Sequence, residues 1–202
     1  MDRHAITNLE QLRDIYPPPK QRTIDKELDH LDAHCRRFIS LSPFAIVSSA
    51  AADGRCDASP KGGPPGFTRV LDHHRLLIPD ATGNRRLDGF QNMLENPHVG
   101  ILFLIPGMGE TLRVNGRVEL TRDPELLDVL ETGGHPAKLA LVVHAEQVYL
   151  HCAKALIRSA LWDPETWAEE LPSAAEILSD HIGIGDVAAS AAALADGYAN
   201  HL

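Results

Sequence analysis

Residues 76–97 read LLIPDATGNRRLDGFQNMLENP, and the interpretation of the whole chain starts from this stretch. An apolar strand at its start is joined to a helix by a turn that contains Gly83, Asn84, Arg85 and Arg86. Backbone amides at a helix start point outward with a partial positive charge, and arginine adds a planar fork of donors. The alternative is that both arginines are solvated residues of the first helical turn. Because cations are the unfavoured sign at a helix N-terminus, the pair predicts a bound anion.

The length and composition indicate one globular domain with appended elements. The chain has 202 residues, of which 44% are hydrophobic and 23% are charged, and this is ordinary for a domain with a substantial core. A net charge of −9 argues against a general nucleic-acid partner. Charges run through residues 1–16, so no secretory signal is predicted, and no apolar segment is long enough to span a bilayer. We therefore expect a cytoplasmic protein.

The cysteines and histidines form no metal or disulfide pattern. Three cysteines lack any CxxC pair and cannot make an even framework, which fits a reducing compartment. The 11 histidines are scattered without HExxH or similar spacing, so no metal site is predicted.

Two helices are predicted before the first strand. Residues 5–15 are predicted to form a short helix with Thr7 as its N-cap, and Glu10, three residues later, completes a capping box. Residues 21–39 carry apolar side chains at steps of three and four, which predicts one amphipathic helix.

Alternation and turn residues predict the strands that follow. Asp53-Gly54 is a hairpin signal between two of them. The run at 99–105 is apolar throughout and is interpreted as a strand that is buried on both faces. Gly116 predicts a bulge in a long strand. The expected strands are residues 44–51, 55–60, 68–71, 75–78, 99–105, 110–121 and 139–150, the last with a possible break near His144.

The glycine- and proline-rich segment 61–67 is either a loop that lets backbone amides approach a ligand or a plain turn. Further helices are predicted at 87–94, 123–129, 174–179 and 186–198, and another directly after the last strand. In that one, Lys154 and Arg158 share a helical face, where they repel each other unless an anion lies beside them. His151 and Cys152 are interpreted as structural. The alanine-rich last helix fits either a dimer contact or packing on the chain's own surface.

Together these elements predict a mainly β (α+β) fold. Six to eight antiparallel strands form a small closed or split β-barrel with flanking N- and C-terminal helices. Within one structural domain, residues 1–40 are the N-terminal helices, 41–162 the barrel and 163–202 the C-terminal helices. Neither GxGxxG after the first strand nor GxxxxGK[ST] occurs, so a dinucleotide-binding sheet and a nucleoside triphosphatase are not supported.

Four segments in order carry a resemblance to a known family: SPKGGPPGF at 59–67, the stretch at 76–97, VGILFLIPGMGETLRVNGRVEL at 99–120 and LHCAKALIRSALW at 150–162. The chain resembles the pyridoxamine 5'-phosphate oxidase-like superfamily, and more narrowly its branch of probable FMN-dependent enzymes of roughly this length. The resemblance implies an FMN-binding split barrel that works as a homodimer, with each flavin in a cleft between subunits.

The resemblance also implies site residues. The family's phosphate-gripping Ser-Arg-Lys is matched by Asn84, Arg85 and Arg86. The pair where the strand edge meets the ring system is matched by Pro79 and Asp80, and a glutamine near the flavin is replaced by Thr111, whose hydroxyl still donates. The strand that lines the flavin ring is matched by Asp57, Ala58, Ser59, Pro60 and Lys61. Lys154 and Arg158 lie in a motif of this branch and are expected to face the cleft.

Pyridoxamine phosphate oxidases themselves end in a Trp and an Arg-x-His segment, whereas this chain ends in an alanine-rich helix and His201-Leu202. The resemblance therefore implies an FMN-dependent oxidoreductase of another, unidentified small substrate, with reduction by NAD(P)H or another carrier. Two alternatives stay open. One is a flavin-binding carrier or sensor without turnover, and the other is a split barrel that binds F420 or haem. The compact phosphate site at Arg85 and Arg86 favours FMN.

Overall fold

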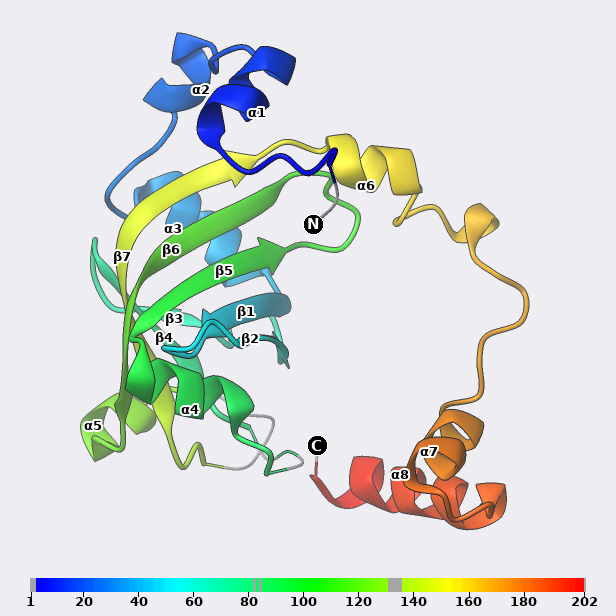
Figure 1. Cartoon of the computed structure of the whole chain (residues 1–202). Helices are drawn as coiled ribbons and strands as arrows, with labels where there is room; N and C mark the ends of the chain where they lie inside the picture. The colour runs from blue at the N-terminus through cyan, green and yellow to red at the C-terminus, as the bar shows by residue number, and fades with distance from the viewer. Residues whose placement is uncertain (1–2, 82, 84, 131–135, 202) are drawn as a thin grey trace.

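A seven-stranded antiparallel sheet in the order β2-β1-β5-β6-β7-β4-β3 forms the body of the molecule (Figure 1). The computed structural model describes residues 3–81, 83, 85–130 and 136–201. The strands are β1 Phe44–Ala50, β2 Cys56–Gly62, β3 Arg69–Val70, β4 Arg75–Pro79, β5 His98–Leu104, β6 Thr111–Thr121 and β7 Ala140–His151. The sheet curves without closing, which confirms the mainly β fold and selects the split form of the predicted barrel.

Helices lie around this sheet and at both ends of the chain (Figure 1). They are α1 Leu9–Ile15, α2 Gln21–Asp25, α3 Ala33–Leu41, α4 Asp88–Glu95, α5 Pro124–Leu127, α6 Lys154–Ser159, a 3-10 turn at Pro164–Thr166, α7 Ala174–Ile182 and α8 Val187–His201. Helix α3 packs on the sheet through Cys35, Phe38 and Ile39, all of which are buried.

Alternating side chains place the core on the inner face of the sheet. On β1, Ala45 and Val47 are buried, and on β5 the buried positions are Val99, Ile101 and Phe103. The residues between them on β5 are half-buried and point to the other face. The interpretation of residues 99–105 as buried on both faces was therefore wrong. An apolar run does not reveal that one of the two faces of the strand stays partly exposed.

The β6–β7 pair contains the predicted bulge. The register shifts between Asn115 and Gly116, so that Gly116 faces Ala145 while Asn115 faces Gln147. A Cβ on Gly116 would collide with the backbone carbonyl of His144. Glycine is required here because the two backbones approach too closely for any side chain. The irregularity of β7 falls beside Ala145, one residue beyond the break expected near His144.

The helix predicted over residues 21–39 is not continuous. Its first part ends at Asp25 and its second begins at Ala33, where Asp32 accepts a hydrogen bond from the Cys35 amide at 2.8 Å. Between them, Leu28 pairs with Val148 through two backbone hydrogen bonds of 2.9 and 2.7 Å. Strand β4 covers β7 only from Ala140 to His144, so the remaining edge of β7 has free backbone groups that Leu28 satisfies.

The N-terminal cap also differs from the prediction. Asn8, rather than Thr7, caps α1 by accepting from the Gln11 amide at 2.9 Å, and the Gln11 side chain accepts from the Thr7 amide at 2.9 Å. Because Gln11 accepts from the amide of Thr7 and not from that of the N-cap Asn8, the helix start is capped by Asn8, and the predicted capping box of Thr7 and Glu10 is not formed.

The C-terminal helices are confirmed as α7 and α8, and they pack on each other. Figure 1 shows the pair set apart from the sheet, at the end of an extended connection after α6. Within the described residues, no single helix has the length and apolar character to cross a membrane. Only α7 and α8 taken together meet that test, on length and composition alone, and a bend of 113° separates them.

Candidate functional site

Lys61 on β2 connects both ends of the turn that carries the two arginines. Its Nζ lies 3.4 Å from Asp80 Oδ1, at the end of β4, and 5.1 Å above the ring of Phe90 in α4. Lys61 and Asp80 are 19% and 26% exposed, so this ion pair is partly shielded from water. Lys61 therefore contacts one residue before the turn, Asp80, and one residue after it, Phe90.

The backbone of this turn is held in an uncommon conformation. Arg85 and Leu87 have φ angles of 62° and 61°, in the left-handed region that favours glycine. Such conformations cost about 1 to 3 kcal/mol each and cluster at functional sites. Leu87 is also the N-cap of α4, and its side chain cannot accept from the first helical amides. The start of α4 thus keeps donors available to a ligand.

Both arginines are exposed, and Arg86 has a partner within the turn. Its Nε donates to Asp88 Oδ2 at 2.7 Å, while the side chain remains 75% exposed. An exposed ion pair contributes about 0 to 1 kcal/mol, so a phosphate can replace Asp88 at low cost. Asn84, the third predicted phosphate ligand, lies outside the described residues.

The inner side of β2 packs directly under α4. Ser59 Oγ donates to Asp57 Oδ2 at 2.6 Å. That carboxylate oxygen would lie 2.8 Å from a Cβ on Gly89, so a larger residue there would have to displace the Asp57 carboxylate. On the helix, Asn92 donates to Ser49 Oγ at 3.3 Å. These contacts fix the position of α4, and with it the turn of Arg85 and Arg86, against the predicted flavin-lining strand.

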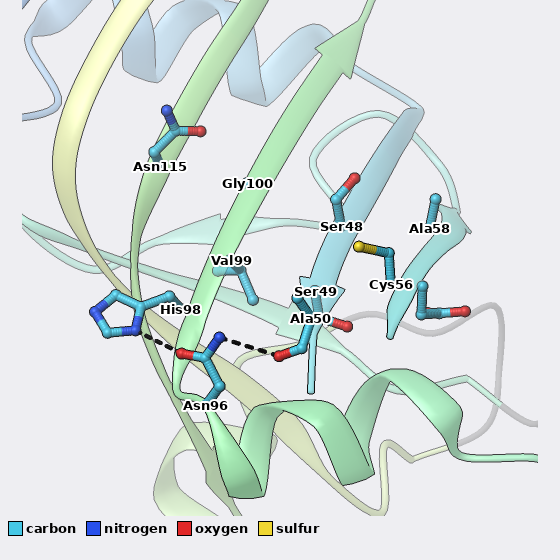
Figure 2. Close-up of a pocket in the computed structure, with 11 residues that line it drawn as sticks. Ser48, Ser49, Ala50, Cys56, Ala58, Asn96, His98, Val99, Gly100 and Asn115 are labelled. Atoms are coloured by element: carbon cyan, nitrogen blue, oxygen red, sulfur yellow. Dashed lines mark hydrogen bonds between the residues drawn. The ribbon is translucent and has the colours of Figure 1, made fainter. Parts of the chain in front are cut away.

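An open hollow of about 570 Å³ lies on the outer face of β1, β2 and β5, with Asn115 of β6 at its edge (Figure 2). Its floor is made by small residues, among them Ser48, Ala50, Ala58 and Gly100. At one end, Asn96 donates to the Ala50 carbonyl at 3.1 Å and contacts His98 Nδ1 at 2.9 Å. A flat floor without large side chains can accept a planar ring, and Asp57 and Ala58 belong both to this hollow and to the predicted flavin-lining strand.

The hollow was not predicted, apart from those two residues. Its signal in the sequence was the repetition of small residues at alternate positions, 48 and 50 on β1 and 56 and 58 on β2. That signal identifies a surface only once β1 and β5 are known to be neighbours.

The other predicted residues lie elsewhere. Pro79 is buried at the end of β4, and Pro60 is exposed on β2. Thr111 is buried at the start of β6, which β1 and β5 separate from β2. Lys154 and Arg158 are exposed on α6, at the end of the sheet opposite α4 (Figure 1). Within one chain, the structure does not bring these last three residues to the turn of Arg85 and Arg86.

A second group of cations surrounds the end of β7. Arg113 donates to the Tyr149 hydroxyl at 2.8 Å, and Lys26 Nζ lies 5.2 Å from the centre of the Tyr149 ring. Burial lowers the pKa of His151, which pairs with Thr111 in register, and the charges of Arg113 and Lys26 lower this pKa further. The neutral form of His151 is therefore favoured, consistent with a structural role.

A comparison with known proteins shows the family to which this chain belongs. A family model described as pyridoxamine 5'-phosphate oxidase matches residues 31–152. The chain belongs to the pyridoxamine 5'-phosphate oxidase-like family. The match includes every strand and the turn of Arg85 and Arg86, and it ends just before α6. No curated protein matches the chain.

Solved structures match part of this chain at low identity. HupZ of Group A Streptococcus is 16% identical, with a TM-score of 0.48 over 60% of this chain and 99% of that one. A protein from Lactobacillus delbrueckii described as a putative pyridoxamine 5'-phosphate oxidase is 19% identical, with a TM-score of 0.48 over 61% and 98%. The haem storage protein HutZ of Vibrio cholerae is 15% identical, with a TM-score of 0.43 over 60% and 94%.

Proposed function

We propose that this protein is an FMN-dependent oxidoreductase that acts on an unidentified small substrate. The observation that carries the proposal is the strained turn before α4, which presents Arg85 and Arg86 beside a helix start that lacks a side-chain cap. Membership of the pyridoxamine 5'-phosphate oxidase-like family supports a flavin as the ligand.

In this proposal the two arginines hold the terminal phosphate of FMN. Both arginines are exposed, and Arg86 pairs with Asp88 at the surface, so both side chains can turn toward an anion. Arginine is suited to this role because its planar fork can donate two hydrogen bonds to neighbouring phosphate oxygens. Lys61 stays with Asp80 and adds positive potential below the turn.

The hollow on the outer face is the surface proposed for the ring system. Its small floor residues leave room for a planar group, and the backbone of Asp57 and Ala58 runs along one side. When bound, the flavin would supply hydride and electron transfer. The residues of this chain would bind the flavin and orient it.

The proposal includes a homodimer with a flavin in each cleft between subunits. Lys154 and Arg158 cannot reach Arg85 and Arg86 within one chain, because α6 and α4 lie at opposite ends of the sheet (Figure 1). A second subunit that packs on the outer face would bring its own α6 to the cleft. This would also place an anion beside the Lys154 and Arg158 pair.

The test is to measure flavin in the purified protein. We expect the native protein to be yellow, or to become yellow with added FMN, and to release FMN on denaturation. A protein that stays colourless with FMN refutes the proposal, and uptake of F420 or haem instead would assign the cleft to that cofactor.

Turnover is tested separately from binding. We expect anaerobic NADH or NADPH to bleach the bound flavin. A protein that binds FMN but is bleached by neither donor nor by dithionite-reduced carriers would be a flavin carrier or sensor rather than an oxidoreductase.

A further inference from the structure

The C-terminal arm, residues 163–202, differs in charge from the rest of the chain. It carries eight of the 28 acidic residues and none of the 19 lysines and arginines. Almost the whole net charge of −9 therefore lies in the arm, and the first 162 residues are nearly neutral. A segment with this charge is repelled by a copy of itself and attracted by surfaces that expose lysine and arginine.

The helices of the arm pack on each other around small residues. Ser179 of α7 and Ser190 of α8 are 0% and 1% exposed. Ser173 caps α7 by accepting from the Glu176 amide at 3.2 Å, and Asp186 accepts from the Ala189 amide at 2.9 Å at the start of α8. With 9 and 15 residues, the two helices are well below the roughly 40 residues that a chain needs to fold by itself. The pair therefore needs another surface to be stable.

That surface is not supplied by the sheet of the same chain, from which Figure 1 shows the pair set apart. Most large apolar side chains of the arm are open to solvent. Among them are Trp167 at 59%, Leu171 at 79%, Ile177 at 46%, Ile182 at 56% and Ile184 at 52% exposed. A soluble chain seldom leaves this many large apolar residues uncovered on one segment unless a partner covers them.

The same chain leaves a second apolar surface uncovered. The outer face of β1 and β5 carries Phe44, which is 38% exposed, and the half-buried residues Ile46, Leu102 and Leu104. Exposed cations, among them Arg85, Lys154 and Arg158, lie on the nearly neutral body. One partner that packs on the outer face of the sheet and meets the arm would cover both apolar surfaces, and this body has the cations that the acidic arm attracts.

We propose that the arm of each subunit clasps a second copy of this chain. The inference rests on the dimer of the proposed function, but it does not require a bound flavin. The contact combines the apolar side chains of α7 and its flanks with the acidic residues beside them, Glu176 and Asp180, which face exposed lysine and arginine side chains of the partner's body. The arm lies outside residues 31–152, so the clasp is an addition to the shared fold.

The test compares dimer dissociation by analytical ultracentrifugation across a dilution series. Ile177→Asp with Ile182→Asp keeps the full chain and changes only exposed side chains. We expect the dimer to dissociate at a protein concentration about tenfold higher or more. Val129→Asp is the matched control, because Val129 is 47% exposed on the body of the chain, and it should leave dissociation unchanged. A chain that ends at Trp167 lacks α7 and α8, so its dimer should dissociate as readily as that of the double variant. Its body should stay folded, because it keeps the Trp162 to Met108 hydrogen bond of 2.8 Å and the Trp167 to Leu161 hydrogen bond of 3.1 Å.

The dependence of dimer dissociation on salt concentration distinguishes the electrostatic part of the contact from the apolar part. Raising the ionic strength should weaken the native dimer, and Glu176→Gln with Asp180→Asn should reduce this dependence. The clasp is overturned if the native and arm-variant chains dissociate equally, or if the native chain is monomeric at every concentration. It is also overturned if chemical cross-linking joins the arm only to the body of its own chain. FMN content is measured in every sample. If the arm variant weakens the dimer but the protein never binds FMN, the clasp is supported and the flavin proposal is refuted. If the protein binds FMN but the arm variant leaves the dimer unchanged, the flavin proposal is supported and the clasp is refuted.

Discussion

Replacing Arg85 and Arg86 by alanine tests the phosphate site directly. Each charge-assisted hydrogen bond to a phosphate is worth roughly 1.5 to 3 kcal/mol, so two contacts give about 3 to 6 kcal/mol. Arg86 must first leave Asp88, and breaking an exposed ion pair of that kind costs up to about 1 kcal/mol. This cost reduces the net contribution of the two arginines to FMN binding. The double variant should therefore lose about 2 to 5 kcal/mol of FMN binding, or about 30- to 5,000-fold in Kd.

The assay is titration of apoprotein with FMN, followed by the quenching of flavin fluorescence. Riboflavin, which lacks the phosphate, gives the internal comparison. Its affinity should be weak for the native protein and almost unchanged in the double variant. Arg75→Ala is the matched control, because Arg75 is also exposed and pairs with a nearby aspartate, Asp72, at 2.7 Å.

Two results would refute the reasoning. Equal FMN affinity in the native and double-variant proteins would place the phosphate elsewhere. An equal loss of FMN and riboflavin affinity would mean that the arginines support the turn rather than the phosphate, which circular dichroism and the melting temperature would then show.

Three further predictions concern the fold. Gly116→Ala should destabilise the protein by about 3 kcal/mol in urea unfolding, because its Cβ would collide with the His144 carbonyl, whereas Gly197→Ala, with open space around it, should stabilise it slightly. Burial, with the nearby Asp32 carboxylate, raises the pKa of Cys35 to about 11, so iodoacetamide at pH 8 should label only the two exposed thiols until the protein is unfolded. Asp32→Ala should cost about 0.5 to 2 kcal/mol through loss of the α3 cap. The hydrogen bond from the Cys35 amide lowers the pKa of Asp32. The ionised Asp32 cap therefore stabilises the protein at neutral pH, and this stabilisation is lost as the pH falls through the lowered pKa. The Asp32→Ala variant should not show this pH-dependent loss.

Local chemistry explains which parts of the fold were predicted. The Asp53-Gly54 hairpin, the alternation along β6 and the bulge at Gly116 depend on residues within a few positions of one another, and the structure has all three. The turn before α4 belongs to the same class, because a pair of arginines beside a helix start is readable from the sequence. The left-handed backbone conformation of Arg85 could not be predicted from the sequence, because arginine rarely adopts that conformation.

Long-range contacts explain what was missed. The apolar spacing of residues 21–39 is that of a helix, and only the free edge of β7 at Val148 draws Leu28 into an extended bridge. In the same way, the apolar run of β5 gives no sign that its outer face lacks a cover. Local periodicity cannot encode a partner that lies far away in the sequence.

The sequence by itself predicted the order of the strands along the chain, a small closed or split barrel, and Arg85 and Arg86 as candidates to hold a phosphate. Tertiary structure alone decided which of the predicted site residues meet. It joined Lys61 to Asp80 and packed β2 under α4, and it placed Lys154 and Arg158 at the opposite end of the sheet. The reason is physical: propensity and pattern act over a few residues, whereas a site is set by the curvature of a sheet whose neighbouring strands come from distant parts of the chain.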